Sequence, residues 1–218
     1  MKQKITLVAS LQPFILTLVI ILFTCSCTIL SPPSPLPHYY LLQTVDKNSC
    51  PLKGSVGPIY SGATKIIVGP ISLPPYLDRS QIVQLVGENR LRLLPIDLWA
   101  EPLDEAVERV LSLNLTQLSH GRIVGEPFSV IIDSKKTAAS TLRLFLKIYN
   151  FEAQYGNKCI LRGKWQLFSG SNSIKPLMEE ETCLTTPLAS LSAQDSVRCM
   201  SKLVEKLSYR IVKKVSEK

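Results

Sequence analysis

Two neighbouring stretches of alternating side chains, Leu142–Gln154 and Lys158–Phe168, set the strictest limit on the fold. An apolar residue at every second position is the pattern of a β-strand that buries one face. The apolar positions are Leu142, Leu144, Leu146 and Ile148 in the first stretch and Cys159, Leu161, Trp165 and Leu167, with Gly163 among them, in the second. Residues 155–157 between them include Gly156 and Asn157, which suit a turn. The sequence therefore predicts a long antiparallel hairpin whose apolar face needs a second layer.

A first amphipathic segment supplies part of that layer. We expect a helix that begins near Asp97 or Glu101, with Pro102 in its first turn, and ends at His120 with Gly121 as its C-cap. Its apolar face, interrupted by the polar Asn114, consists of Leu103, Val107, Val110, Leu111, Leu115 and Leu118. This spacing is typical of a helix that packs one side against a core.

A second amphipathic helix ends the sequence. Ser192, with Asp195 three residues later, resembles a capping box in which Asp stands where Glu is usual. Its apolar stripe consists of Val197, Met200, Val204, Leu207, Ile211 and Val215. A basic row at four-residue intervals consists of Arg198, Lys202, Lys206, Arg210 and Lys214. That row is either a solvated helix face or a contact for phosphates or an acidic partner surface.

Shorter apolar runs add further strands to the sheet. We expect them at Tyr39–Thr44, Lys65–Ile71, Ile82–Val86, Arg90–Leu94 and Phe128–Asp133. Ile82–Val86 and Arg90–Leu94 form a hairpin around Gly87-Glu88-Asn89, with Arg90 and Arg92 on its wet face and Leu91 and Leu93 on its buried face. Asp46–Gly62 reads as a loop, and residues 169–191 as a mobile loop whose acidic run, Glu179–Glu181, is solvated unless it binds a partner. The predicted fold class is α+β: one domain with a mixed or antiparallel sheet packed by two main amphipathic helices.

The first 27 residues predict where the chain works. Lys2 and Lys4 form a positive start, and the apolar run Phe14–Phe23 has the length of a signal-peptide core and is short for a bilayer span. Ser26 is the small residue that a lipobox places before its cysteine, so we expect cleavage after residue 26 and lipid on Cys27. The alternative is an uncleaved anchor that spans the membrane from about Ile5 to Phe23.

Lipidation at Cys27 would anchor the mature protein stably. Each methylene buried in the bilayer contributes about 0.8 kcal/mol to membrane binding, so two or three acyl chains anchor the protein stably and one chain does not. Thr28 follows the cysteine; the absence of aspartate there points to the outer membrane. Residues 27–37 then form the lipidated terminus and a proline-rich, extended linker, and residues 38–218 form the folded domain.

Charge and cysteines leave several readings open. The net charge is +8, and +6 once the leader with Lys2 and Lys4 is removed, which fits nucleic acid, anionic lipid or an acidic partner, or solubility alone. Outside the leader the cysteines are Cys50, Cys159, Cys183 and Cys199. In an oxidising compartment these four allow up to two disulfides in three pairings, and the sequence does not choose among them.

No pattern in the sequence indicates catalysis, metal binding or nucleic-acid binding. The chain has no GxSxG, no GxGxxG and no phosphate-binding loop, and its two histidines, His38 and His120, lie in a linker and at a helix end. No cysteine–histidine spacing fits zinc. No strand combines basic and aromatic residues in the RNA-reading manner.

Four segments resemble the PqiC (YmbA-type) family of ABC-type transport auxiliary lipoproteins. They are Val68–Arg79 (VGPISLPPYLDR), Gln81–Val83, Asn89–Leu91 and Asp97–Leu103 (DLWAEPL). The resemblance covers about residues 38–218 and is most specific from Val68 to Leu111. Its signature residues, which are candidates for a partner surface, are Pro74, Tyr76, Asp78, Arg79, Trp99, Glu101 and Pro102. Their structural reading is Trp99 as a core anchor, Pro102 at a helix start and Asp78-Arg79 as a charged turn.

The resemblance implies a non-enzymatic outer-membrane lipoprotein that faces the periplasm. Such proteins form homo-oligomeric rings at the outer-membrane end of tunnels built by MCE-domain proteins, which carry lipid between the two membranes with an inner-membrane partner. No cofactor is implied beyond the covalent lipid on Cys27. Two alternatives remain open: a structural or assembly lipoprotein of the outer membrane that is unrelated to lipid traffic, and a periplasmic hydrolase, for which the sequence offers no reactive residue.

Overall fold

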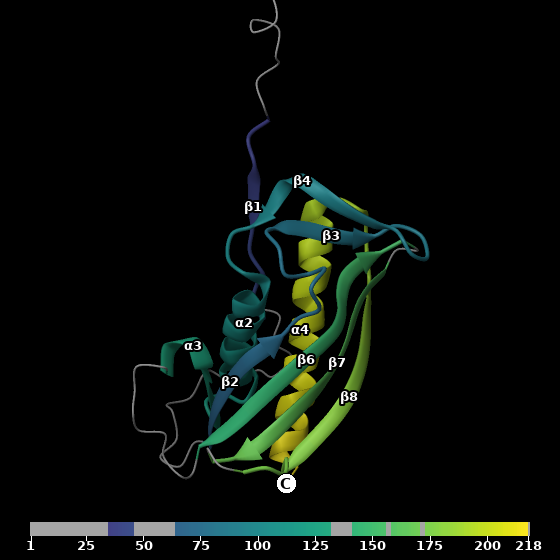
Figure 1. Ribbon diagram of the computed structural model, residues 1–218. Helices are drawn as coiled ribbons and strands as arrows, with labels where there is room; N and C mark the ends of the chain where they lie inside the picture. The colour runs from purple at the N-terminus through teal and green to yellow at the C-terminus, as the bar shows by residue number, and fades with distance from the viewer. Residues whose placement is uncertain (1–34, 46–63, 132–140, 156–157, 171–172, 218) are drawn as a thin grey trace, which may run out of the picture. The chain divides into compact units, whose positions relative to one another are not determined.

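The computed structural model describes residues 35–45, 64–131, 141–155, 158–170 and 173–217 (Figure 1). The chain divides into two compact units, Met1–Leu36 and Pro37–Lys218, and all the elements belong to the second. Its strands are β1 (His38–Tyr40), β2 (Thr64–Ser72), β3 (Gln81–Leu85), β4 (Leu91–Trp99), β5 (Ile123–Pro127), β6 (Leu142–Gln154), β7 (Lys158–Ser169) and β8 (Met178–Pro187), and its helices are α2 (Leu103–Leu118), α3 (Phe128–Ile131) and α4 (Ala193–Ser216). The leader, Cys27 and the expected loop at Asp46–Gly62 lie outside the described residues.

The eight strands form one mixed sheet centred on β6. One edge of β6 pairs antiparallel with β7, which pairs antiparallel with β8. The other edge pairs in parallel with β2 along the first half of β6 and with β3 at its end. β5 extends the sheet beyond β2, and β4 and β1 extend it beyond β3. The structure is thus the α+β domain with a mixed sheet that the sequence predicts.

Helices α2 and α4 cover one face of this sheet, as Figure 1 shows. The alternation in β6 and β7 is confirmed, because Leu144, Leu146, Leu161 and Trp165 are almost wholly buried. The apolar stripe of α4 is buried from Val197 to Ile211. These contacts form the core, and each large apolar side chain removed from water adds about 1.5–3 kcal/mol to the driving force for folding.

One disulfide joins the two layers. Cys159 in β7 and Cys199 in α4 form it, with their Cα atoms 6.1 Å apart. Cys183 is free and exposed on β8. The sequence left the disulfides open, and the structure forms Cys159–Cys199; Cys50 lies outside the described residues.

The prediction of a mobile loop at residues 169–191 is wrong for its central part, which is strand β8. The acidic run Glu179–Glu181 suggested a solvated segment, but cations from other elements meet it. Lys164 of β7 lies 2.9 Å from Glu179, and Lys214 of α4 lies 2.9 Å from Glu180. Thr182, Leu184 and Thr186, which lie on the same face of the strand as Glu180, are buried.

The strand predicted at Phe128–Asp133 is also wrong. The strand here is β5, which ends at Pro127, and Phe128 begins the single-turn helix α3. The buried carboxylate of Glu108 explains the turn, because its Oε1 accepts hydrogen bonds from both the backbone N–H and the hydroxyl of Ser129, each at 2.9 Å. Gly69 leaves room for this carboxylate: a Cβ there would lie 2.4 Å from Glu108 Oε2.

The ends of β1 and α2, and the buried face of the hairpin formed by β3 and β4, also differ from the prediction. β1 contains only His38–Tyr40, and residues 41–45 continue without strand pairing. Leu91 and Leu93, which we expected on a buried face, are each 41% exposed. Helix α2 begins at Leu103, so Asp97 belongs to β4 and Pro102 is the N-cap residue.

The C-terminal end of α2 is capped two residues earlier than predicted. Ser119 is the C-cap, and His120 takes the left-handed conformation with a φ of 54°. The N–H groups of His120 and Gly121 donate to the carbonyls of Gln117 and Thr116, which is the Schellman arrangement.

Candidate functional site

The end of the domain where the described chain enters contains the residues that the sequence singled out. The two main helices are parallel: Asn114 contacts Ser208 in the second half of each helix, and nearer both C-termini Leu118 and Lys213 line one hollow. Both helices therefore begin at the end where β1 lies, and the C-terminus lies at the other end (Figure 1). Helix N-termini carry partial positive charge, which is complemented here by Asp104 and Glu105 in the first turn of α2 and by Asp195 in that of α4.

Residues 41–45, which we call the strap, join β1 to the two helices. Leu42 and Val45 are buried between them. The backbone N–H of Gln43 donates to Ser201 Oγ in α4 at 3.0 Å, and that of Val45 donates to Asn114 Oδ1 in α2 at 2.9 Å. The strap is thus held by side chains rather than by a strand partner.

Five signature residues from two distant segments line one hollow of about 320 Å³. The five residues are Asp78, Arg79, Trp99, Glu101 and Pro102, and we call the cavity that they line the signature hollow. Trp99 is buried, as a core anchor should be, whereas Asp78 and Arg79 are exposed. Neither of these two charged side chains has a hydrogen bond or ion pair with another residue of the described chain, which leaves both available to a partner.

Glu101 connects the signature hollow to the strap. Its carboxylate receives the Nε–H of Arg109 at 3.1 and 3.2 Å, and Nη2 of the same guanidinium donates to the carbonyl of Leu42 at 3.2 Å. Arg109 is one turn from Asn114 in α2, and neither role was foreseen from the sequence. The one available signal was a polar Asn114 on an otherwise apolar helix face.

A second set of contacts fixes β1 beside β4. The hydroxyl of Tyr40 donates to Asp97 Oδ1 at 3.1 Å, and His38 Nδ1 lies 3.2 Å from the same oxygen. Burial, and then the hydrogen bond to Asp97, raises the pKa of the Tyr40 hydroxyl. Tyr40 therefore remains a donor at physiological pH.

Two other signature residues, Pro74 and Tyr76, are not among the residues that line the hollow. The Tyr76 hydroxyl donates at 2.7 Å to Oε2 of Glu152, a carboxylate that is 1% exposed. Glu152 also accepts from the N–H of Phe151 and from the amides of Asn150 and Gln154. Burial, followed by the contact with Glu152, raises the pKa of Tyr76. This pair is structural: it fastens the Pro74–Leu77 turn, where Leu77 N–H donates to the Pro74 carbonyl, onto β6.

A groove of about 860 Å³ lies next to the signature hollow and shares Ala100 with it. One wall of the groove is formed by the chain from Tyr39 to Thr44. Its other wall is the N-terminal half of α4, including Val197, Arg198 and Lys202.

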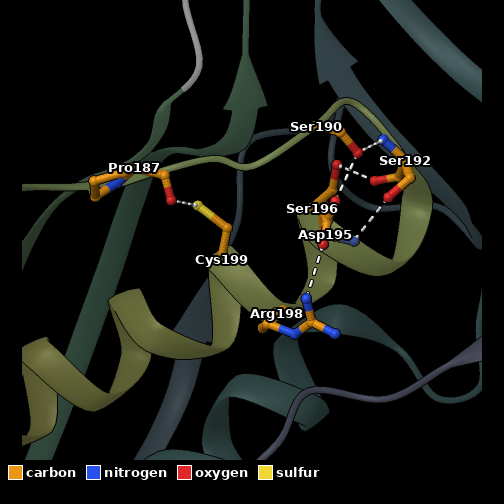
Figure 2. A network of polar contacts seen from close by, with 7 residues as sticks. All are labelled: Pro187, Ser190, Ser192, Asp195, Ser196, Arg198 and Cys199. Carbon is orange, nitrogen blue, oxygen red and sulfur yellow. Dashed lines mark hydrogen bonds and ion pairs between the residues drawn. The ribbon is translucent and has the colours of Figure 1, made fainter.

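A network of polar contacts holds the start of α4, as Figure 2 shows. The Asp195 N–H donates to Ser192 Oγ at 3.1 Å, and the hydroxyl of Ser190 donates to the Asp195 carboxylate at 2.6 Å. Arg198 Nη1 donates to the same carboxylate at 2.9 Å. The bond from Ser190, more than the charge of Arg198, lowers the pKa of Asp195. The predicted cap at Ser192 is confirmed, although Asp195 bonds the preceding Ser190 and not the backbone of Ser192.

This arrangement suits binding. Within the described ranges, no three His, Cys, Asp or Glu side chains are grouped so that they could hold a metal ion. The described helices include none that is both long and apolar enough to span a bilayer. The signature hollow and the groove offer unpaired charges, an aromatic side chain and apolar surface, which is the composition of a recognition site.

The chain belongs to the family of ABC-type transport auxiliary lipoprotein components, whose family model matches residues 51–212. Two curated relatives are similar at 26% identity over 139 residues, the intermembrane transport lipoprotein PqiC of Escherichia coli K12 and that of Shigella flexneri. The match covers 63% of this chain and 66% of each relative, just under two thirds of their length.

Solved structures support the fold. A crystal structure of an uncharacterized protein superposes with a TM-score of 0.64 at 17% identity and covers 83% of this chain and 99% of its own. The protein XCC0632 from Xanthomonas campestris gives a TM-score of 0.59 at 13% identity and covers 80% of this chain and 92% of its own. At these identities the likeness concerns the fold alone.

Proposed function

We propose that this protein is an outer-membrane lipoprotein, anchored through Cys27, that docks on an MCE-type tunnel and helps to move lipid between the membranes and keep the outer membrane intact. It acts without catalysis, as a homo-oligomeric ring facing the periplasm. The observation that carries this proposal is the signature hollow. Residues about twenty positions apart in the sequence meet there, and Asp78 and Arg79 are exposed with no partner in the described chain.

Two facts support the proposal. The family is one of transport auxiliary components, and the PqiC relatives are named intermembrane transport lipoproteins. The leader ends in Phe23-Thr-Cys-Ser-Cys27, with a small residue before the cysteine that we expect to carry lipid. A membrane anchor and a partner surface on one chain are what a docking subunit needs.

Charge reversal at the signature hollow tests the docking claim. Arg79→Glu in the full lipoprotein should lower its co-purification with the MCE-domain protein of its own cell at least about tenfold, since a lost interface charge pair costs on the order of 2 kcal/mol. Arg162→Glu, an exposed change on the uncovered face of β7, is the matched control and should leave co-purification unchanged. Equal co-purification for both variants would reject this surface. Recovery of a barrel-assembly or lipopolysaccharide-export protein without any MCE protein would reject the function and favour an assembly lipoprotein.

The anchor is tested separately. Cys27→Ala should release the protein from outer-membrane fractions, and mass spectrometry of the wild-type protein should find the lipid on residue 27. A Cys27→Ala protein that remains fully membrane-bound would show that the leader is an uncleaved anchor.

A further inference from the structure

The groove beside the strap is amphipathic. On one wall Tyr39 is 64% exposed and Leu41 is 43% exposed, which is unusual for large apolar side chains that lie next to one another. On the other wall Arg198 and Lys202 are exposed, and Glu205 is the acidic residue among the described lining. Apolar surface and positive charge thus meet across one opening.

The basic row of α4 is used differently along its length. Lys206 donates to the carbonyl of Thr185 at 2.7 Å, Arg210 donates to Thr182 Oγ1 at 2.8 Å, and Lys214 pairs with Glu180. These contacts hold the C-terminal half of α4 on β8. Lys202, in the groove, has no hydrogen bond or ion pair with any residue of the described chain. Its ammonium group therefore remains available to an external anion.

The position of the groove indicates the source of that anion. The groove wall begins with Tyr39 of β1, and the chain before it leads to the lipidated terminus of a lipoprotein. The ten residues between Cys27 and His38 can span at most about 40 Å, so the membrane surface lies within reach of this end.

We propose that this groove binds phospholipid of the membrane that holds the anchor. Tyr39 and Leu41 enter the boundary between headgroups and acyl chains, where amphipathic aromatic side chains are favoured. Lys202, which has no partner in the described chain, meets the phosphate groups, and Arg198, which pairs with Asp195 at 2.9 Å, lies beside it. The inference rests on the anchorage in the proposed function and not on the tunnel partner.

Site-specific photocrosslinking tests the contact in the full lipoprotein. Leu41 is replaced by p-benzoylphenylalanine in cells grown with radioactive phosphate, and phosphate label on the protein is measured after illumination. The anchor itself contains no phosphate, so the label reports bilayer phospholipid, which mass spectrometry then identifies. Leu113 on α2, which is 44% exposed against 43% for Leu41, is the matched control position. We expect at least about fivefold more label at position 41, the factor that one basic residue contributes near an anionic surface.

Charge-reversal variants distinguish lipid binding in the groove from mere closeness of position 41 to the membrane. Lys202→Glu, combined with the label at position 41, should lower the yield about fivefold or more, whereas Lys158→Glu, an equal change of net charge on the exposed start of β7, should not. Equal labelling at positions 41 and 113, no effect of Lys202→Glu, or a crosslink to a protein in place of lipid would each overturn the proposal. Lipid labelling without recovery of an MCE protein would reject the proposed function and leave this inference standing.

Discussion

At the scale of single residues, buried polar groups determine how the signature segments are held. Glu152 is almost fully buried and has no cation beside it, so its charge is stabilised by four neutral donors. A hydrogen bond to a charged group contributes more than one between neutral groups, and a lost donor leaves the desolvation penalty in place. Tyr76, which the resemblance placed on a partner surface, supplies the shortest of these bonds.

Removal of the Tyr76 hydroxyl should therefore destabilise the domain. Tyr76→Phe is expected to lower the free energy of unfolding by about 1.5–3 kcal/mol, measured by urea denaturation, because Glu152 loses its shortest donor. Tyr155→Phe, at a hydroxyl that is on a 72% exposed side chain, should stay within about 0.5 kcal/mol of wild type. If Tyr76→Phe left the free energy of unfolding unchanged, water would be replacing the hydroxyl and the residue would be free for a partner.

Alkaline pH should act through the same residue. The folded protein raises the pKa of Tyr76 above its ordinary value of 10.0, so the protonated form is favoured by folding. The stabilisation is complete below pH 10 and is lost as the pH rises above it, because the unfolded chain then releases the proton more readily. The difference in unfolding free energy between wild type and Tyr76→Phe should therefore shrink between pH 9 and pH 11. A constant difference over this range would contradict the assignment.

At the scale of elements, α4 unites the domain. It covers β6, β7 and β8, forms the disulfide with β7, holds the strap through Ser201 and supplies the groove wall. Its periodicity made the helix and its buried stripe predictable. Its partners were not predictable, because strand β8, whose Glu180 pairs with Arg210 and Lys214 of the basic row, carries the acidic run that was predicted to be a loop.

Loss of the Cys159–Cys199 disulfide should lower stability strongly. The bond closes a loop with a sequence separation of 40. The chain-entropy model assigns about 4 kcal/mol to a loop of this length, so the double variant Cys159→Ala/Cys199→Ala should have a much lower midpoint of thermal unfolding than wild type. Cys183→Ser, at the exposed free cysteine, is the control and should change the unfolding free energy by less than about 0.5 kcal/mol. Equal midpoints for the double variant and wild type would show that the bond contributes no net stability.

At the scale of the whole molecule, the two ends of the domain differ. The strap, the groove and the signature hollow lie at the end where the chain enters, and the last turns of α2 and α4 lie at the other. Such polarity suits a protein tethered by its N-terminus, because the recognition surfaces are then within reach of the anchor. The core of the described chain belongs to the unit Pro37–Lys218.

The folded unit should accordingly not need the preceding residues. Residues 37–218, exported to the periplasm with an unrelated cleavable signal, should be recovered without membrane and should unfold at the same temperature as the detergent-solubilised full lipoprotein, within about 2 °C. A markedly lower midpoint would show that residues 1–36 contribute to the fold.

The sequence by itself determined the elements whose patterns are long. The alternation in β6 and β7, the stripes of α2 and α4 and the cap at Ser192 are local properties, so a few neighbouring residues suffice to specify them. Only the tertiary structure decided the rest. The acidic strand β8 depends on Lys164, Arg210 and Lys214, the turn at Phe128 depends on Glu108, and the disulfide depends on where α4 crosses β7. In each of these cases the deciding partner is distant in sequence. Electrostatic pairing and close approach act through space, so a pattern along the chain carries no record of them until the fold brings the groups together.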